Sequence, residues 1–547
     1  MTTTRSDIET AVTLDERLEE LVQLRSLADA ADEIIEQGLR DQLNLDRVLA
    51  LLFPLLGSHL QACRAWVRTF DDNLKRKDFY WSEDDDLLWP VDLSHLEERT
   101  RGGEHVAEVV DGHSVVACKI DVAGEDFGTA ALCVAEPLDG PELEQRARLL
   151  TVWCEQLDNH LASIAQARRK HHAVTALSEA LRDTVLSDGI EKALAVLAEH
   201  VRYDHLLLVY RHDEDSEGGT AAYWIVKDRK LIYDSRGQTD PEVDAFMRTH
   251  AMRLLLHDET NAVAARFGLG TFREEVMING VKDTRIVGRV LVSNRSGSDF
   301  STIERDLLER FADFLRQRIV DFNREWRHLS LAFPRTTVSR LLNEDNYVER
   351  YLRPRERDVA IMYCDISGFT RVSEQVLRTP ALIGTLVDTW SNHVVEMIWG
   401  SDGVFDKMVG DCIIGLWGPP FFEMSPQEAC RRAALAAIEV RAFTRSLTQS
   451  ELLPQLRELD QPLTVSTGLN YCPLFVGLFG PNENYTGFAS GMNNAARLQG
   501  VAARDEILCM DNMCQVLGSR GEFSEEKAAQ VKNVAEPLRF RSLLGVH

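Results

Sequence analysis

The sequence has little basic charge: 61 Lys and Arg residues stand against 87 Asp and Glu residues, a formal net charge of −26. A nucleic-acid-binding surface needs a basic face, so this deficit argues against nucleic acid as a partner. The ten cysteines form no CxxC pair. We therefore expect reduced, mostly buried thiols rather than disulfides or zinc ligands.

Long hydrophobic runs are also missing. No uninterrupted apolar stretch approaches the ~18 residues that a membrane-spanning helix requires. The first ten residues, MTTTRSDIET, lack the charged-then-apolar pattern of a signal peptide. We expect no membrane span and a cytoplasmic location. With 547 residues, 44% of them hydrophobic and 27% charged, the chain has the length and composition for three or four globular domains.

Two carboxylates stand at the ends of predicted strands in the C-terminal part. The β-branched, apolar run at 359–363 leads to Asp365, and a helix is predicted just after it. Further on, VFDKMVGDCIIGLWG predicts a hairpin, with Lys407 on the entering strand and Asp411 at the turn. Paired carboxylates are what Mg²⁺ ions need beneath a phosphate-bearing substrate. Aspartate is also common in turns and helix caps, so a purely structural role stays open at this point.

A second polar pair follows in YTGFASGMNNAARLQG. Asn493 and Arg497 are four residues apart in a predicted helix, so they share one face. An amide and a guanidinium on one face can hold a ribose and a developing phosphoryl charge. A solvated helix face is the alternative.

Taken together, CDISGFT, FDKMVGD, GMNNAARL and the later VKNVAEPL resemble the signature motifs of the class III nucleotidyl cyclases, in the family order. The resemblance covers residues 333–544. It implies an α+β protein whose catalytic domain, at 350–547, has the ferredoxin-like βαββαβ arrangement. It also implies that the catalytic domain works as a homodimer, because the family draws the groups of each site from two protomers.

The resemblance further implies a metal site and a base site. Asp365 and Asp411, with Ile366, would bind two Mg²⁺ or Mn²⁺ ions under the triphosphate. Lys407 and Thr486 would read the purine. Lysine only donates and a threonine hydroxyl can accept, which fits the N1 acceptor and amine donor of adenine, whereas guanine would favour a carboxylate in place of the lysine. Threonine at this position resembles a subgroup in which bicarbonate stimulates some members.

By the same resemblance, Asn493 would orient the ribose, Arg497 would stabilise the transition state and Lys532 would contact phosphate. We therefore expect an adenylate cyclase that converts ATP to 3′,5′-cyclic AMP and pyrophosphate. The alternatives are a guanylate cyclase and a catalytically silent ligand sensor.

The N-terminal part shows a repeated order of predicted elements. A helix is expected at 1–40, and the order helix, strand, further strands and long helix then occurs twice, at 41–165 and 173–322. Both segments resemble GAF domains, which are six-stranded antiparallel sheets flanked by helices and often bind a small ligand. In the second, Arg295 and Glu304 are expected to form an ion pair.

Residues 306–345 are expected to link the second of these domains to the catalytic domain. Apolar residues follow a nearly heptad spacing there: Leu308, Phe311, Leu315, Ile319, Phe322, Trp326, Leu329 and Phe333. This pattern predicts either a helix packed on its own domain or, as we favour because the seam continues past the preceding fold, a parallel coiled coil between two protomers.

Overall fold

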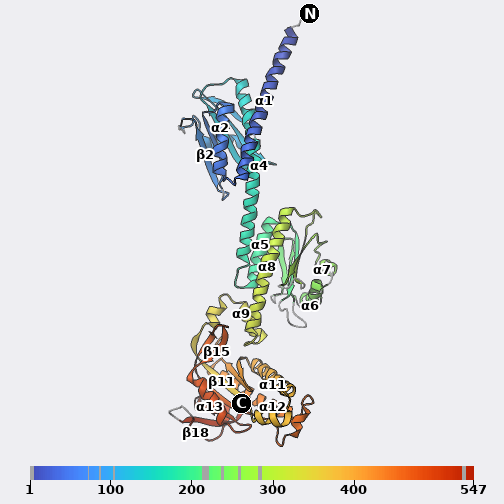
Figure 1. Cartoon of the computed structure of the whole chain (residues 1–547), viewed down its shortest axis with the longest axis vertical. Coiled ribbons are helices and arrows are strands. Elements are labelled where there is room, and N and C mark those ends of the chain that lie inside the picture. The colour runs from blue at the N-terminus through green and yellow to red at the C-terminus, as the bar shows by residue number, and fades with distance from the viewer. Residues whose placement is uncertain are drawn as a thin grey trace. The chain divides into compact units, whose positions relative to one another are not determined.

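The computed structural model describes residues 5–71, 73–84, 88–102, 105–211, 221–235, 240–256, 260–280, 286–531 and 537–547. The chain divides into two compact units, residues 1–176 and 177–547, and helix α4 (Gly140–Ala180) contains the boundary (Figure 1). In the described part of the chain, no helix is both long enough and apolar enough to span a membrane. The ten cysteines are free in this structure, and most of them are buried.

The first unit is built on a five-stranded antiparallel sheet. Its strands are β1 (Arg64–Phe70), β2 (Arg76–Ser82), β3 (Val106–Val110), β4 (His113–Val122) and β5 (Glu125–Val134), in the spatial order β2-β1-β5-β4-β3. Side chains alternate between the two faces of a strand. Ala65 and Val67 accordingly face a core shared with α1 (Arg5–Arg40), α2 (Leu45–Leu60) and α4, whereas Trp66 faces α3 (Leu93–Arg101).

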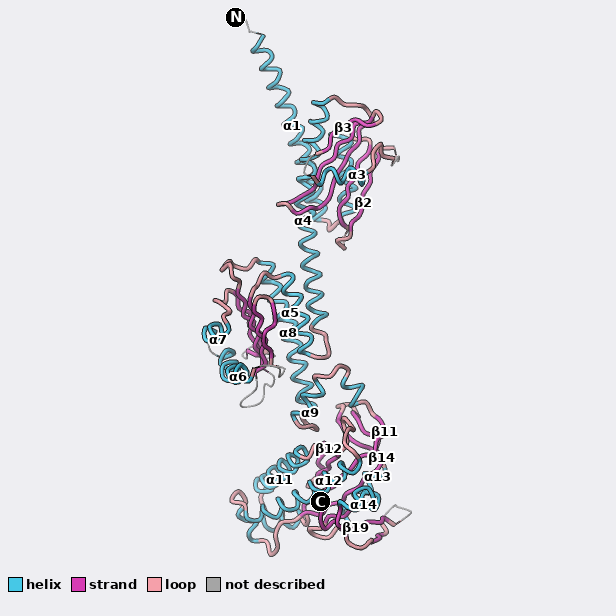
Figure 2. Tube along the Cα trace, turned by 180° about the vertical axis from the view of Figure 1, so that it is seen from behind, coloured by secondary structure: helices cyan, strands magenta, loops and turns pink. Residues whose placement is uncertain are grey.

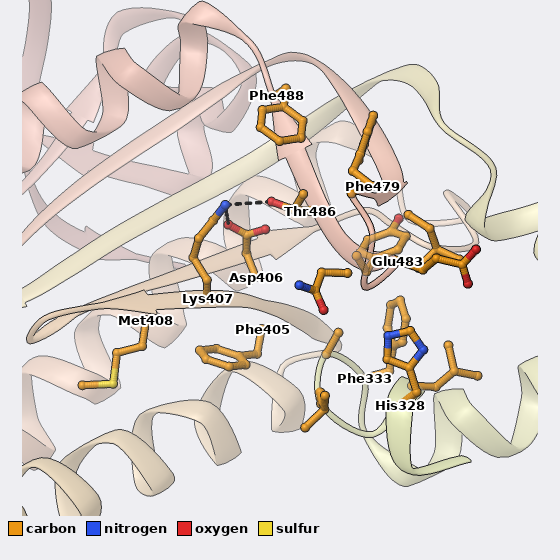
Figure 3. A pocket seen from close by; sticks show the side chains of 17 residues that line it. His328, Phe333, Phe405, Asp406, Lys407, Met408, Phe479, Glu483, Thr486 and Phe488 are labelled. Atoms are coloured by element: carbon orange, nitrogen blue, oxygen red, sulfur yellow. Dashed lines mark hydrogen bonds and ion pairs between the residues drawn. The ribbon is translucent and has the colours of Figure 1, made fainter. Parts of the chain in front are cut away.

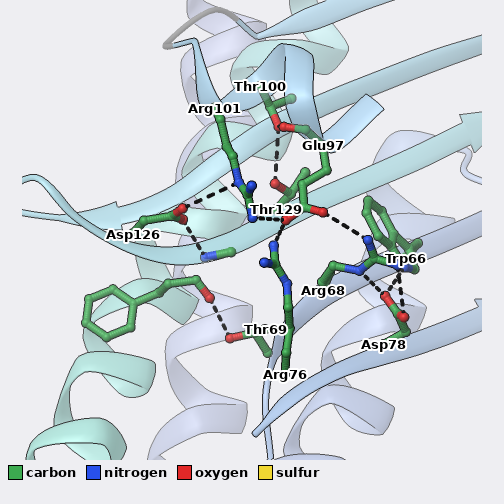
Figure 4. Close-up of polar contacts among 12 residues, drawn as sticks. Trp66, Arg68, Thr69, Arg76, Asp78, Glu97, Thr100, Arg101, Asp126 and Thr129 are labelled. Atoms are coloured by element: carbon green, nitrogen blue, oxygen red, sulfur yellow. Dashed lines mark hydrogen bonds and ion pairs between the residues drawn. The ribbon is translucent and has the colours of Figure 1, made fainter. Parts of the chain in front are cut away.

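A buried carboxylate joins α3 to this sheet (Figure 4). The side chain of Glu97 is only 8% exposed, and it accepts a 2.9 Å contact from Arg68 on β1 and a 2.8 Å contact from Arg101 on α3. Arg76 on β2 also pairs with it. Burying a charge is costly unless it is paired, so these arginines compensate a carboxylate that bridges helix and sheet.

The second unit begins with another five-stranded antiparallel sheet, in the order β8-β7-β6-β10-β9. Its strands are β6 (His205–Arg211), β7 (Ala221–Lys227), β8 (Lys230–Asp234), β9 (Glu274–Asn279) and β10 (Ile286–Ser293). Helices α6 (Pro241–Leu256) and α7 (Thr260–Phe267) cover one face. Helix α8 (Thr302–Leu329) contacts α5 (Leu186–His200), β9 and β10 on the other (Figure 2).

Two expectations for these domains differ from the structure. Each sheet has five strands among the described residues, one fewer than the six implied by the GAF resemblance. Arg295 and Glu304 do not pair with each other: Arg295 pairs with Asp228, while Glu304 is bound by Arg202 with an Nε–Oε1 distance of 3.0 Å. Glu304 also closes a capping box with Ser301 at the start of α8, which draws it toward the helix end rather than toward Arg295.

The apolar residues of the linker that were predicted to pair two protomers pack within the chain. Of these eight apolar side chains, all but Trp326 are buried in the single chain. Helix α8 ends at Leu329, and a short turn leads to α9 (Arg335–Leu342), so the linker is no continuous helix. Phe333 packs on Tyr485 of the following domain, with ring centroids 4.8 Å apart. These side chains already have partners within the chain, which agrees with the alternative of a helix packed on its own domain, and a coiled coil between protomers stays a prediction.

The C-terminal domain has the expected βαββαβ core. It runs β11 (Arg355–Ile366), α11 (Pro380–Gly400), β12 (Gly403–Val409), β13 (Cys412–Trp417), α12 (Pro426–Ser446) and β14 (Val465–Phe479). The central sheet has the order β12-β13-β11-β14-β16-β19-β17, with β15 (Asn484–Phe488) beside β14 and β18 (Lys527–Ala529) beside β19. The remaining paired strands are β16 (Ile507–Met510), β17 (Gly521–Phe523) and β19 (Leu538–Val546).

Helices cover both faces of this sheet. The core beneath α11 and α12 takes Cys364 and Ile366 of β11 and also includes α14 (Asp511–Leu517). The opposite face carries α13 (Ser490–Val501), whose Leu498 packs with Leu508 of β16. The strand β14 is long, and its C-terminal half forms a hairpin with β15.

Candidate active site

The two predicted metal carboxylates lie together at one edge of the catalytic sheet. Asp365 is paired in register with Cys412, the residue that follows Asp411. Gly410 adopts φ +65° at the turn before Asp411, a conformation that glycine adopts at little cost. Because side chains alternate along β11, Cys364 and Ile366 enter the core and Asp365 faces the side that carries α13.

Burial perturbs both carboxyl groups, and the charge of Asp411 adds to its effect on Asp365. Burial, together with the charge and hydrogen bond of Asp411, raises the pKa of Asp365 to about 7, while a hydrogen bond from Gln499 of α13 opposes the rise. Burial likewise raises the pKa of Asp411. Two close carboxylates cannot both ionise easily without a compensating cation.

The residues present fit divalent cations completed by a phosphate substrate. Hard cations such as Mg²⁺ prefer carboxylate oxygens and take further oxygens from phosphates and water. The side chain of Ile366 is buried in the core, so only its backbone carbonyl is chemically suited to the metal role predicted for it. Among the described residues, no third Asp, Glu, His or Cys completes a metal cluster here.

The predicted base-reading residues are in direct contact. Lys407 lies on β12 and Thr486 lies on β15, opposite Gly477 of β14. The Lys407 Nζ donates a 3.0 Å hydrogen bond to the Thr486 hydroxyl. Side chains separated by 79 positions in the sequence are thus brought together by the β14–β15 hairpin.

These two residues line a cavity of about 530 Å³ (Figure 3). Aromatic side chains form much of its wall, including Phe405, Phe479 and Phe488. The end of the linker, with His328 and Phe333, completes another side. A largely apolar cavity with a few convergent polar groups has the character of a binding site for a flat, heteroatom-rich ring.

One carbonyl group of the linker accepts two hydrogen bonds beside this cavity. The Ala332 oxygen accepts a 3.0 Å hydrogen bond from the Phe405 backbone N–H and a 3.1 Å hydrogen bond from the Trp399 indole N–H. Phe405 is two residues before Lys407 on β12. The end of the linker is therefore bonded both to α11 and to the strand that carries the predicted base-reading lysine.

Helix α13 carries the predicted ribose and phosphate residues, Asn493 and Arg497. It packs close to β14 because Gly468 has no side chain: a Cβ there would lie 2.4 Å from the Ala495 carbonyl oxygen. Asn493 is exposed and Arg497 is half-buried. Arg497 Nη1 donates to the Asn494 side chain at 3.4 Å. Lys532, the remaining predicted phosphate contact, lies outside the described residues.

Sequence reasoning missed two polar residues in this region. Gln499 donates a 2.8 Å hydrogen bond to Ser466 Oγ and a longer, 3.4 Å one to Asp365. Its position two residues after Arg497 on the same short helix was an available signal. Asp406, adjacent to Lys407, also lines the cavity. Among the described residues, neither Asp365 nor Asp411 lines the cavity. In one chain, the cavity at Lys407 and Thr486 and the carboxylate pair are therefore separate regions.

Residues 352–540 match the family of the adenylate and guanylate cyclase catalytic domain. This part of the chain is therefore a class III cyclase catalytic domain, of adenylyl or guanylyl type, and domains of this class are lyases. The family implies divalent metal ions and a nucleotide substrate. The match leaves both N-terminal domains unassigned.

Solved structures similar to this domain include enzymes of both specificities. The guanylyl cyclase Cya2 is 23% identical over 36% of this chain and 95% of that chain, with a TM-score of 0.32. The adenylyl cyclase CyaB from P. aeruginosa is 23% identical over 36% of this chain and 98% of that chain, with a TM-score of 0.33. The guanylate cyclase domain of RhGC from Catenaria anguillulae, in complex with GTP, is 16% identical over 35% and 100%, with a TM-score of 0.31. No curated protein matches the sequence.

Proposed function

We propose that the protein is an adenylate cyclase that converts ATP to 3′,5′-cyclic AMP and pyrophosphate. The observation that carries the choice of base is the contact between Lys407 and Thr486 at the cavity wall. Lys407 offers only donors, which suit the N1 acceptor of adenine, and the Thr486 oxygen can accept from the 6-amino group. Guanine presents a donor at N1 and an acceptor at O6, the reverse of this arrangement.

The remaining residues divide the chemistry among them. The ribose 3′-oxygen forms a bond to the α-phosphorus, and the bond from that phosphorus to the α,β-bridging oxygen breaks, releasing pyrophosphate. Mg²⁺ or Mn²⁺, two per site and bound by Asp365, Asp411 and the Ile366 carbonyl, would favour the ionised 3′-hydroxyl and offset the triphosphate charge. Arg497 stabilises the charge that develops on the phosphoryl oxygens, and Asn493 orients the ribose.

The charges at the site support this assignment. The whole chain carries a formal charge of −26, so a polyanionic nucleotide must be met by cations at the site itself. The pair of crowded carboxylates supplies a place for metal ions, while Arg497 and Lys532 supply positive charge from other segments. In the family these groups come from two protomers, and we propose a homodimer formed through the catalytic domains.

We further propose that the two N-terminal domains are GAF-like sensors that regulate the cyclase. Each has an antiparallel sheet flanked by helices, the general build of a small-ligand-binding domain. The second is connected to the cavity at Lys407 and Thr486 through α8 and the Ala332 carbonyl. A change in the position of the linker would therefore act directly on β12.

Product analysis of the purified full-length chain tests the reaction. ATP and GTP are supplied separately with Mg²⁺ or Mn²⁺, and an Asp365→Ala variant serves as the inactive control. We expect cyclic AMP from ATP, and none from the control. Cyclic GMP as the main product would overturn the adenine assignment. Absence of product from either nucleotide, with normal nucleotide binding, would favour a silent sensor.

A further inference from the structure

One buried carboxylate at the cavity has no role in the site as assigned so far. The side chain of Asp406 is fully buried, at 0% exposure. In the described part of the chain, neither of its carboxylate oxygens makes a hydrogen bond. Its nearest charged group is Lys407, with 3.6 Å between the Nζ and an Asp406 oxygen, and the side chain lines the cavity (Figure 3).

A β-bulge explains why two successive side chains meet on one face of β12. Phe405 is opposite Gly415 and Lys407 is opposite Ile414, so Asp406 has no counterpart on β13. Phe405 and Met408 both pack against the core beneath α11 and α12. An extra residue in a strand breaks the two-residue alternation. Asp406 and Lys407 therefore both face the cavity, beside Thr486, as Figure 3 shows.

The neighbours of Asp406 supply too few donors for it. Burial raises the pKa of Asp406, and the Thr486 hydroxyl, the Lys407 ammonium and the Gly487 N–H lower it without forming well-aligned hydrogen bonds. Lys407 has three N–H donors, one of which is committed to Thr486. A buried carboxylate is stable only when donors reach it, so the bound ligand is the natural source of the missing donor.

From this geometry we infer that Asp406 is a specificity-determining residue that accepts a hydrogen bond from the 6-amino group of the adenine ring, next to Lys407, which donates to N1. The inference rests on the proposed function and deepens it. Adenine presents its N1 acceptor and 6-amino donor side by side, and Lys407 and Asp406 present a donor and an acceptor side by side. In this arrangement Thr486 holds the Lys407 ammonium and shares the second amine hydrogen.

The inference makes a specific demand on the substrate. A purine nucleotide without the 6-amino group would leave Asp406 buried and without a donor in the complex. A site built to bind a polar group rejects the analogue that lacks it, because its own buried group stays unpaired. Purine riboside 5′-triphosphate, which has hydrogen in place of the amine, is the matched probe.

The test compares kcat/KM for ATP and for purine riboside 5′-triphosphate in the full-length protein and in Asp406→Asn. The ratio isolates the amine contact, because a general defect lowers both numbers together. We expect the wild-type protein to prefer ATP by about 10- to 100-fold, as for a hydrogen bond to a charged group. In Asp406→Asn the preference should fall severalfold, because the neutral amide oxygen that replaces the carboxylate accepts a weaker hydrogen bond.

Asp358→Asn is the matched control. Asp358 is an exposed aspartate on β11, the strand next to β13, and it is not among the residues lining the cavity. Its ratio should equal that of the wild type. An Asp406→Asn variant that loses activity equally toward both nucleotides would assign Asp406 a structural role and overturn the inference.

Equilibrium binding separates this inference from the proposed reaction. The 3′-deoxy forms of the two nucleotides cannot cyclise, and calorimetry gives their dissociation constants whether or not the protein turns over ATP. A wild-type preference for 3′-deoxy-ATP that falls severalfold in Asp406→Asn would support the inference even if no cyclic AMP forms. Equal affinity of the wild type for both 3′-deoxy nucleotides would overturn it.

Discussion

Burial and the neighbouring Asp411 carboxylate make the ionisation of Asp365 unfavourable. Burial and the partner carboxylate raise the pKa of Asp365 to about 7, far above that of an exposed aspartate. A carboxyl group whose pKa is higher in the folded state lowers stability as the pH rises toward that pKa. The metal-free site is therefore destabilising near neutral pH, a common property of sites built for charged ligands.

This destabilisation predicts that Asp365→Asn stabilises the metal-free protein. With a chelator at pH 8, we expect its thermal midpoint to exceed that of the wild type by about 2–4 °C, or about 1 kcal/mol in a domain of this size. The difference should shrink as the pH falls from 7 toward 4, because the wild-type carboxyl becomes protonated in the folded state. Thermal unfolding followed at several pH values provides the measurement. Asp460→Asn, an exposed aspartate, is the control; an equal rise in both variants would contradict the prediction.

The residues of the site could be predicted from motif spacing to different degrees. The contact of Lys407 with Thr486 and the pairing of Asp365 with Asp411 agree with the motifs, because strand ends and turns are marked by local residues. Asp406 was missed because the two-residue alternation of a regular strand places it on the face opposite Lys407. The available signal was the apolar pair Phe405 and Met408, three apart on one strand, which requires a bulge if both are to reach the core.

At the scale of elements, the start of α8 depends on a single glutamate. Glu304 is 6% exposed at its side chain and completes a capping box with Ser301. It also accepts hydrogen bonds from the backbone N–H and the side chain of Arg202, at 2.9 and 3.0 Å. Burial alone would raise the pKa of Glu304, but Arg202 and Ser301 lower it to about 2. The ion pair therefore ties the linker helix to the segment that precedes β6.

We expect Glu304→Gln to destabilise the second N-terminal domain by about 1–3 kcal/mol at pH 7, as for buried hydrogen bonds to a charged group. Because the folded-state pKa is depressed, this contribution is full above about pH 4.5 and is lost as the pH falls toward 2. Urea unfolding of both proteins between pH 7 and pH 3 measures the difference. Glu309→Gln, an exposed position one turn further along α8, should change stability by less than about 0.5 kcal/mol. A Glu304→Gln difference that grows on acidification would contradict the assignment.

Elements were predicted best where the pattern is local. The βαββαβ order of the catalytic domain follows from alternating strand and helix periodicities. The packing partner of the apolar seam on α8 could not be predicted from the sequence, because a heptad-like stripe shows that a helix face is buried and not what covers it. Pro473 lies inside β14, but the strand continues past it because its hairpin partner, β15, pairs with the far half.

At the scale of the whole molecule, the proposed dimer can be tested by complementation. Asp365→Ala removes a proposed metal ligand, and Arg497→Ala removes the guanidinium expected to act on the same nucleotide from the partner. Each variant alone should be inactive. Co-expressed in equal amounts, they should recover about a quarter of wild-type activity, because half of the dimers are mixed and each mixed dimer has one intact site. Inactivity of the mixture, with mixed dimers verified by two affinity tags, would place both residues of a site in one protomer.

The Ala332 carbonyl has a thermodynamic consequence for the regulation proposed above. It accepts hydrogen bonds from Phe405, beside the base cavity, and from Trp399 on α11. If nucleotide binding changes the free energy of either hydrogen bond, it changes the free-energy difference between alternative positions of the linker by the same amount. Coupling of this kind is reciprocal. A ligand of the second N-terminal domain that tightens nucleotide binding must itself bind more tightly when nucleotide is present. Nucleotide bound to the catalytic domain would therefore raise the affinity of the N-terminal domain for its ligand.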